Sequence, residues 1–331
     1  MIRTIRIWIN NARAIALPQS QLPSMLAFCM AVKQDGFVWW LGLLAILGVA
    51  SGHLGMNLFD DYFDYKVRES GFRDVLNRRG FRARISKCDY LISGNTTINQ
   101  LLKACISFGA VALATGIIIW FFRGNFILWL VIATVIIGIS YSGPPLRLSY
   151  HGLGELIIGF IFGPLLMIGV YYSACGIFNF SILFVSIPIG MLVTNIVYSH
   201  AIMDYEPDKE VGKMTFAVLL KKKKHMLFFH KLLINLAYII IIAGILFGYL
   251  SHYYWLVFLT FPLALYQQYL MNEFVKNPDK SFSPKWWMGP MKKNWEDVQK
   301  ASLDWFLIRW LLARNLLSFF CLIIIIISFI Q

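Results

Sequence analysis

Long runs of apolar residues with few or no charges dominate the chain, and they restrict the folds open to it. Each run spans about 20 residues, the length that a helix needs to cross roughly 30 Å of hydrocarbon. Apolar residues make up 58% of the 331 residues and the mean hydropathy is +0.64, above ordinary soluble domains. The sequence therefore predicts an all-α integral membrane protein with about nine transmembrane helices, at residues 16–32, 37–56, 101–122, 125–142, 155–175, 177–198, 227–250, 253–271 and 304–330.

The basic residues predict the topology. Most of the 30 Lys and Arg residues fall in the N-terminal segment and in alternate connections between spans, which the positive-inside rule assigns to the cytoplasm. An odd number of spans then places the N-terminus in the cytoplasm and the C-terminus outside, with a bacterial inner membrane as the expected location. The net charge of +13 is mostly this topology signal, so it does not indicate nucleic-acid binding. The basic loops can still attract anionic lipid or a phosphate-bearing substrate.

Three connections on the predicted cytoplasmic side are longer than the others. They cover residues 57–98, 199–225 and 272–303, and we expect them to cap a cavity in a single transmembrane domain that comprises residues 1–331. The third contains the string SPKWWMGPMKKNW. This string is basic and amphipathic, so we expect it to lie on the membrane surface.

Two clusters of acidic residues stand at the ends of predicted spans. In NLFDDYFDYK, the residues Asn57, Asp60, Asp61 and Asp64 have the i, i+3, i+4, i+7 spacing that places side chains on one helix face. Like charges at this spacing repel one another, so a cation is expected among them. Mg²⁺ meets that need because it binds through a few carboxylates together with substrate phosphates. Both clusters face the cytoplasm in the predicted topology.

The second cluster, DYEPDKEVGKMT, places Asp204 and Asp208 at i, i+4. Pro207 is compatible with a helix only near its start, so part of this cluster is expected to be an unwound turn. Two such clusters on one side of the membrane favour a shared site for metal and diphosphate over two solvated helix ends. Nearby basic residues can neutralise phosphate oxygens: Arg147, Lys209 and Lys213. Ordinary positive-inside bias explains Lys209 equally well.

Three strings are informative when taken together: NLFDDYFDYK, YSGPPLRLSYHGLGE and DYEPDKEVGKMT. They occur in the order and on the membrane side expected of the UbiA-type intramembrane prenyltransferases, a family that the chain resembles. The opening string NARAIALPQSQLPS is similar to the arginine-and-proline segment of the 1,4-dihydroxy-2-naphthoate branch. The resemblance covers most of the chain. It implies nine transmembrane helices around a central cavity open to lipid, with two aspartate-rich motifs that hold Mg²⁺ against a polyprenyl diphosphate.

The resemblance also implies roles for single residues. By motif position, Asn57, Asp61 and Asp64 are first-site ligands, and Asp204 and Asp208 are second-site ligands, the four aspartates being the catalytic acids. Asp60 stands where the family commonly has asparagine, and we count it among the metal ligands. Residues placed near the diphosphate or the acceptor are Tyr141, Ser142, Arg147, Lys209 and Lys213. Glu155, after the glycines of HGLG, is expected to be structural, because a helix start favours an acid there.

These roles imply Mg²⁺-dependent transfer of a polyprenyl group to an aromatic acceptor in quinone biosynthesis, with 1,4-dihydroxy-2-naphthoate giving a demethylmenaquinone. Before Asp204 the chain reads YSHAIM, where the naphthoate branch usually has two asparagines and an arginine, so 4-hydroxybenzoate, haem and lipid glycerol remain alternative acceptors. An ion-coupled transporter is a second class, but it would place acids in mid-span rather than at span ends. A structural subunit with acidic loops would bind no prenyl diphosphate. Prenyl chain length and oligomeric state are not predicted.

Overall fold

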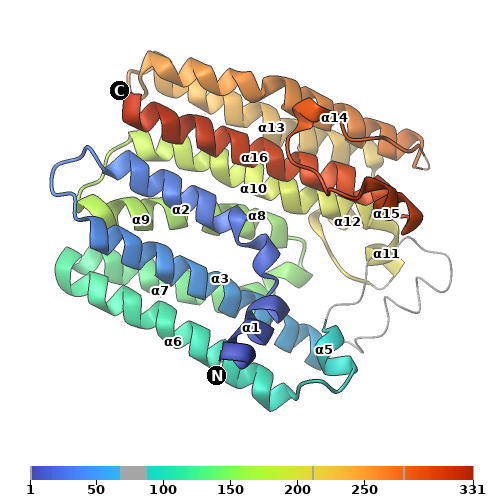
Figure 1. The fold of residues 1–331 in the computed structure, drawn as a ribbon, viewed down its shortest axis with the longest axis horizontal. Coiled ribbons are helices and arrows are strands. Elements are labelled where there is room, and N and C mark those ends of the chain that lie inside the picture. The colour runs from blue at the N-terminus through green and yellow to red at the C-terminus, as the bar shows by residue number, and fades with distance from the viewer. Residues whose placement is uncertain (1, 68–87, 211, 279, 331) are drawn as a thin grey trace.

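The computed structural model describes residues 2–67, 88–210, 212–278 and 280–330, and every regular element within these ranges is a helix. The long helices run side by side in one bundle (Figure 1). Within the described ranges, seven are long and apolar enough to cross a membrane: α3 (Trp39–Val67), α6 (Ile98–Arg123), α7 (Asn125–Ser142), the continuous helix α8–η3–α9 (Gly154–Cys175), α10 (Ser181–Met203), α13 (Lys223–Leu246) and α16 (Asp304–Ile330). The protein is an integral membrane protein.

Two of the nine predicted spans form shorter helices than expected. The range 16–32 contains α2 (Pro18–Ala31), which has 14 residues. The range 253–271 begins as a 3₁₀ helix, η4 (His252–Thr260), and continues into α14 (Phe261–Lys276), which has 16 residues. Each helix alone is shorter than the seven listed above, so the count of nine crossings stays a prediction.

Helix α10 lies inside the bundle and packs against α13, α16 and the helix α8–η3–α9. The last contact is close because two glycines face each other. A Cβ atom added to Gly163 in η3 (Ile161–Leu165) would lie 2.4 Å from the Cα of Gly190 in α10. Small residues of this kind let helix backbones approach closely in a membrane, where dispersion contacts replace the hydrophobic effect as the driving force.

The two ends of the bundle differ (Figure 1). At one end the connections are short, and Arg123 donates hydrogen bonds to the carbonyls of Gly36, Ser173 and Ala174 at 3.0, 2.8 and 2.6 Å. The other end, on the right in Figure 1, we call the site end. It holds four short helices: α5 (Asp89–Ile92), α11 (Tyr205–Glu210), α12 (Phe216–Leu220) and α15 (Trp295–Lys300).

The acidic strings sit differently on their helices. Helix α3 continues past residue 56, the predicted end of its span, through Val67, so the first acidic string forms the last turns of a helix and not the start of a loop. Helix α10 instead ends at Met203, and Asp204 is its C-cap. Pro207 is the third residue of α11, in the first turn, where a backbone N–H would have no intrahelical acceptor, so the proline costs no hydrogen bond. The expected break in the second string is confirmed.

Candidate active site

Asp61 is the most enclosed carboxylate of the first acidic string. Its side chain is 3% exposed, and its Oδ1 lies 3.1 Å from the guanidinium of Arg13. Its Oδ2 accepts a 3.0 Å hydrogen bond from the hydroxyl of Tyr90 in α5. A carboxylate buried without a cation or donors is strongly unfavourable. The N-terminal segment and α5 therefore make the burial of Asp61 possible.

Arg13 ties the N-terminal segment to α3. It has left-handed backbone angles, φ 58° and ψ 51°, at the start of η1 (Ala14–Ala16). Its guanidinium donates to the Asn57 carbonyl at 2.8 Å and lies 3.8 Å from Asp60. In return, the side-chain amide of Asn57 donates to the Ala12 carbonyl at 2.9 Å. These contacts fix the N-terminal segment against the acidic string from both sides.

The charge states around Asp61 follow from these contacts. Burial alone would lower the pKa of Arg13, but the carboxylates of Asp61 and Asp60 outweigh burial and raise it. Arg13 is therefore cationic at every physiological pH. Burial, followed by the charge of Asp61, raises the pKa of Tyr90. Tyr90 therefore stays neutral and remains a hydrogen-bond donor to the carboxylate.

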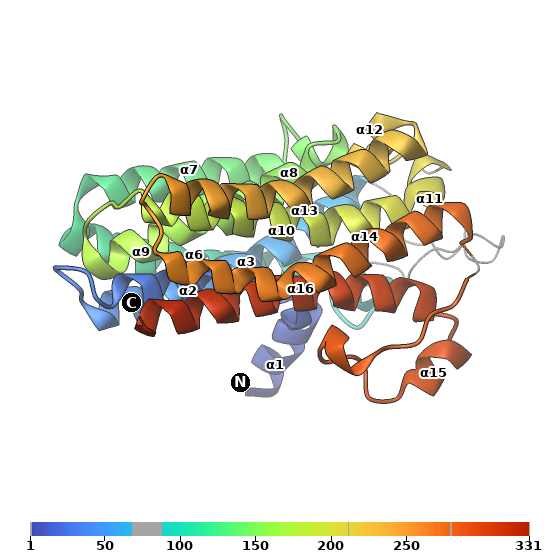
Figure 2. The same cartoon turned by 90° about the horizontal axis from the view of Figure 1, so that it is seen from above.

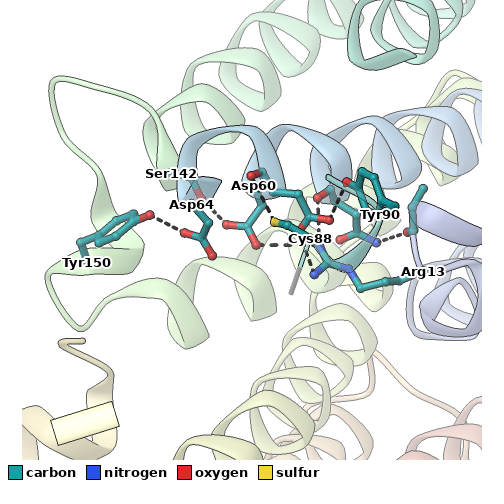
Figure 3. Close-up of polar contacts among 10 residues, drawn as sticks. Arg13, Asp60, Asp64, Cys88, Tyr90, Ser142 and Tyr150 are labelled. Carbon is teal, nitrogen blue, oxygen red and sulfur yellow. Dashed lines mark hydrogen bonds and ion pairs between the residues drawn. The ribbon is translucent and has the colours of Figure 1, made fainter. Parts of the chain in front are cut away.

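The other two carboxylates of the string contact the connection between α7 and α8 (Figure 3). Ser142, the last residue of α7, donates to Asp60 Oδ1 at 2.6 Å. The Tyr150 hydroxyl, in η2 (Leu148–Tyr150), donates to Asp64 Oδ1. Within the described ranges, no three His, Cys, Asp or Glu side chains are grouped closely enough to hold a metal ion by themselves. The acids gather at one place but do not form a closed cage.

The second acidic string lies at the same end of the bundle, between α10 and α12. Asp204 and Asp208 are 2% and 1% exposed. Lys213 lies close to the second of them, with Nζ 3.7 Å from Asp208 Oδ1. Lys209 is exposed, and its Nζ stands 5.9 Å from the centre of the Tyr205 ring. The structure brings Lys213 to the acids and places Lys209 over an aromatic ring.

The segment 142–155 reaches elements of both acidic strings. Through Ser142 and Tyr150 it contacts the first string. Glu155, in the first turn of α8 (Gly154–Phe160), accepts hydrogen bonds from the Phe216 amide at 3.1 and 3.3 Å. Phe216 begins α12, directly after the second string, so this segment couples the positions of the two strings. Glu155 therefore holds the start of α12, and its purely structural role stays a prediction.

Two further predicted site residues belong to the same region. Arg147 is half-buried and has a left-handed φ of 45°, and its carbonyl contacts His151 Nδ1 at 3.0 Å. Tyr141 is also half-buried, and its ring carbon Cε2 would lie 3.5 Å from a Cβ atom added to Gly154. Tyr141 therefore lies where the segment enters α8.

Sequence reasoning missed three residues that hold the first string: Arg13, Tyr90 and Tyr150. Arg13 fits the positive-inside rule, and this hides its local role. Tyr150 belongs to YSGPPLRLSYHGLGE, so a motif signal for it was present. Tyr90 follows the second span in a stretch with no pattern that points to Asp61, and only the fold brings the two together.

The sequence profile of the UbiA prenyltransferase family matches residues 22–289, a range that includes both acidic strings and the segment between them. The chain belongs to this family. This UbiA prenyltransferase is 26% identical over 275 residues to the 1,4-dihydroxy-2-naphthoate octaprenyltransferase of Bacillus subtilis (strain 168). The aligned region covers 80% of this chain and 82% of the Bacillus protein. It is 27% identical over 225 residues to the 2-carboxy-1,4-naphthoquinone phytyltransferase of Synechocystis sp., with 66% and 68% covered.

The fold of the UbiA prenyltransferase agrees with that of solved relatives. A UbiA homologue from Archaeoglobus fulgidus, bound to GPP and Mg²⁺, has a TM-score of 0.59 to this chain at 17% identity. The likeness covers 93% of this chain and 99% of that one. At so low an identity, the likeness shows the shared fold.

Proposed function

We propose that this UbiA prenyltransferase transfers a polyprenyl group from its diphosphate to 1,4-dihydroxy-2-naphthoate, with Mg²⁺, and so forms a demethylmenaquinone. The names of the Bacillus and Synechocystis relatives support a naphthoate-type acceptor. The observation that carries the proposal is the pair of acidic strings at one end of the bundle, with segment 142–155 contacting elements of both.

The oxygen donors of the two strings fit Mg²⁺. This ion is usually held by one or two carboxylates together with substrate phosphates, and not by a complete protein cage. That suits the described carboxylates, which lie at one end of the bundle but form no group of three that could hold a metal ion alone. The Archaeoglobus homologue binds both Mg²⁺ and GPP. When bound, Mg²⁺ would supply positive charge that makes the diphosphate a better leaving group. The residues proposed to hold it are Asn57, Asp60, Asp61, Asp64, Asp204 and Asp208.

The basic and hydroxyl side chains have a different role in the proposal. Two basic side chains would bind diphosphate oxygens: Lys213, next to Asp208, and Arg147, beside η2. Arg147 can bind in a bidentate geometry that lysine lacks. Ser142 holds Asp60 in position. Tyr141 and the exposed Lys209 complete the set assigned to substrate binding.

Breaking the C–O bond of the prenyl diphosphate gives an allylic carbocation and free diphosphate. A carbon of the electron-rich ring attacks the cation, and the ring then loses a proton or, where that carbon carries a carboxylate, CO₂. Water would capture the cation, so it must be excluded. The apolar core of the bundle would supply that exclusion, and its helices would surround the prenyl tail.

We also propose that the chain crosses the membrane nine times, with α2 and the η4–α14 helix as the two short crossings. The N-terminus and the site end would face the cytoplasm, and the C-terminus would lie outside. In Figure 1 the C-terminus lies at the end opposite α11 and α15, which supports the proposed position of the C-terminus.

Prenyl transfer by the purified protein in detergent tests the proposal, with Mg²⁺ or EDTA and with geranylgeranyl diphosphate as donor. Dihydroxynaphthoate and hydroxybenzoate are offered together, so the product names the acceptor. We expect a Mg²⁺-dependent naphthoate product that Asp61→Ala and Asp204→Ala reduce by at least about 100-fold. Asp35→Ala, an exposed acid at the opposite end, is the control and should retain activity. Near-normal activity of either site variant would refute the metal assignment.

A further inference from the structure

The chain between α14 and α15 turns back along α16 instead of passing directly across the site end (Figure 2). Its deepest part is held by Asn315, which lies eleven residues beyond Asp304, the first residue of α16. The Asn315 amide donates to the Met288 carbonyl at 2.8 Å and to the Pro290 carbonyl at 3.0 Å. A single side chain on the transmembrane helix therefore holds two carbonyls of this connection.

The neighbouring contacts require a close fit. Gly289 has a φ of 85°, and a Cβ atom added to it would lie 2.6 Å from a ring carbon of Phe319, one turn further along α16. On the other side, the Trp287 ring packs edge-on against Tyr266 of α14, with 5.0 Å between centroids. Met288 is fully buried. The segment thus packs against α14 and α16 together.

The depth of this contact follows from helix geometry. The Lys33 ammonium donates to the Phe329 carbonyl at 3.1 Å, so this part of α16 lies at a polar boundary, and counting about 20 residues back from it places the opposite boundary of the hydrocarbon around Trp310. Asn315 lies five residues beyond Trp310, or about 7 Å at 1.5 Å per residue. Met288 and Pro290 are bonded to Asn315. They therefore lie about as deep as an interfacial segment that enters the boundary of headgroups and acyl chains.

Irregular backbone at this depth must have its polar groups satisfied by protein. The Asn315 amide serves the Met288 and Pro290 carbonyls, and proline at position 290 has no N–H to satisfy. The Met288 amide donates to the Lys285 carbonyl at 3.0 Å. The condition is met for these three groups, the two carbonyls and the Met288 amide. The same condition gives the Asn315 amide a structural role inside a transmembrane helix.

The outer side of the segment is suited to lipid. Trp286 is 92% exposed, although the next residue, Trp287, packs inward against Tyr266. Residues 281–295 contain no Asp or Glu, and their three lysines are all exposed: Lys285, Lys292 and Lys293. Trp is favoured at the level of the headgroups, and an anionic surface attracts lysines that lie near it.

We propose that residues 281–295 form a re-entrant loop that enters the membrane leaflet at the site end and binds anionic phospholipid. Trp286 would lie at the boundary of headgroups and acyl chains, and the three lysines would contact phosphate groups above it. This proposal concerns a lipid contact on the outside of the bundle and is independent of the transfer reaction.

A nitroxide label at Pro290→Cys, in the full chain reconstituted in phosphatidylcholine–phosphatidylglycerol nanodiscs, measures the depth. Gln299→Cys, on the exposed side of α15, is the matched control. The unsubstituted protein gives the background, because four native cysteines are buried and Cys29 is partly buried. We expect oxygen to relax the label at 290 more than a water-soluble nickel chelate does, at a depth of about 5–10 Å, and the reverse at 299. Equal nickel access at both positions would overturn the re-entrant loop.

The lipid charge is tested with the same label. In phosphatidylglycerol the label at 290 should be less mobile than in phosphatidylcholine. Replacing the lysines in K285Q/K292Q/K293Q should remove that difference while leaving the depth in phosphatidylcholine unchanged. Identical mobility of the original lysine-containing protein in the two lipids would overturn the assignment of anionic headgroups.

Discussion

Arg13→Gln tests whether the N-terminal segment supplies the charge that Asp61 needs. The substitution removes a 3.1 Å ion pair to Asp61 and a 2.8 Å hydrogen bond to the Asn57 carbonyl. Removing one partner of a fully buried pair costs about 3–5 kcal/mol. Here the Arg13 side chain is 34% exposed and Tyr90 still donates to Asp61, so we expect a loss of about 2 kcal/mol. For a chain of this size that corresponds to a decrease of about 3 °C in melting temperature.

The assay is thermal unfolding in detergent, with EDTA, for the wild type, Arg13→Gln, Asp61→Asn and the double variant. If the two side chains interact, Arg13→Gln should cost clearly less when Asp61 is already neutral. Arg13→Lys is the matched control that keeps the charge, and it should recover part of the loss. An equal cost on both backgrounds, or a cost below about 0.5 kcal/mol, would refute the reasoning.

Three further substitutions probe the contacts around the site. Tyr150→Phe removes the hydrogen-bond donor to Asp64. The Mg²⁺ concentration for half-maximal transfer should change by up to about tenfold, which corresponds to the free energy of one hydrogen bond. The melting temperature should change by no more than about 2 °C. Glu155→Leu leaves the Phe216 amide without its acceptor and should cost about 1–3 kcal/mol in thermal unfolding, whereas Glu155→Gln keeps an acceptor oxygen and should cost less. Gly163→Ala should lower the melting temperature, because its Cβ would meet Gly190 at 2.4 Å, while Gly109→Ala, with open space around it, should not.

The sequence was sufficient for the fold class and for seven of the spans, because both depend on local properties. Apolar length identifies a crossing helix wherever it packs. It was less reliable at α2 and at η4–α14, where prolines and a 3₁₀ segment shorten the regular helix. It also ended the second span at residue 56, although α3 continues to Val67, because the acids resemble the start of a loop. A helix that leaves the hydrocarbon does not have to end there.

For the candidate site, spacing along one helix predicted that Asn57, Asp60, Asp61 and Asp64 would lie together, and it could not predict their partners. Asp60 and Asp64 bond to Ser142 and Tyr150, which are more than 80 positions away in the chain. Partners at that separation depend on how α3, α7 and η2 pack, and no local pattern contains this information. The same limit explains why Asn315 and the loop at 288–290 were not connected in advance.

The position of Arg13 has a consequence for the order in which the proposed ligands bind. At an effective dielectric constant of 20, unit charges 4 Å apart interact by about 4 kcal/mol, so a divalent ion at Asp61 would repel a nearby guanidinium by roughly twice that amount. The ion pair with Arg13 therefore opposes binding of Mg²⁺ alone. A diphosphate brings negative charge that attracts both cations at once, so Mg²⁺ and diphosphate should bind together more readily than Mg²⁺ by itself. In that arrangement Arg13 would change from the counter-ion of Asp61 to a contact of the substrate without leaving the site, which would give the N-terminal segment a reason to be fixed to α3.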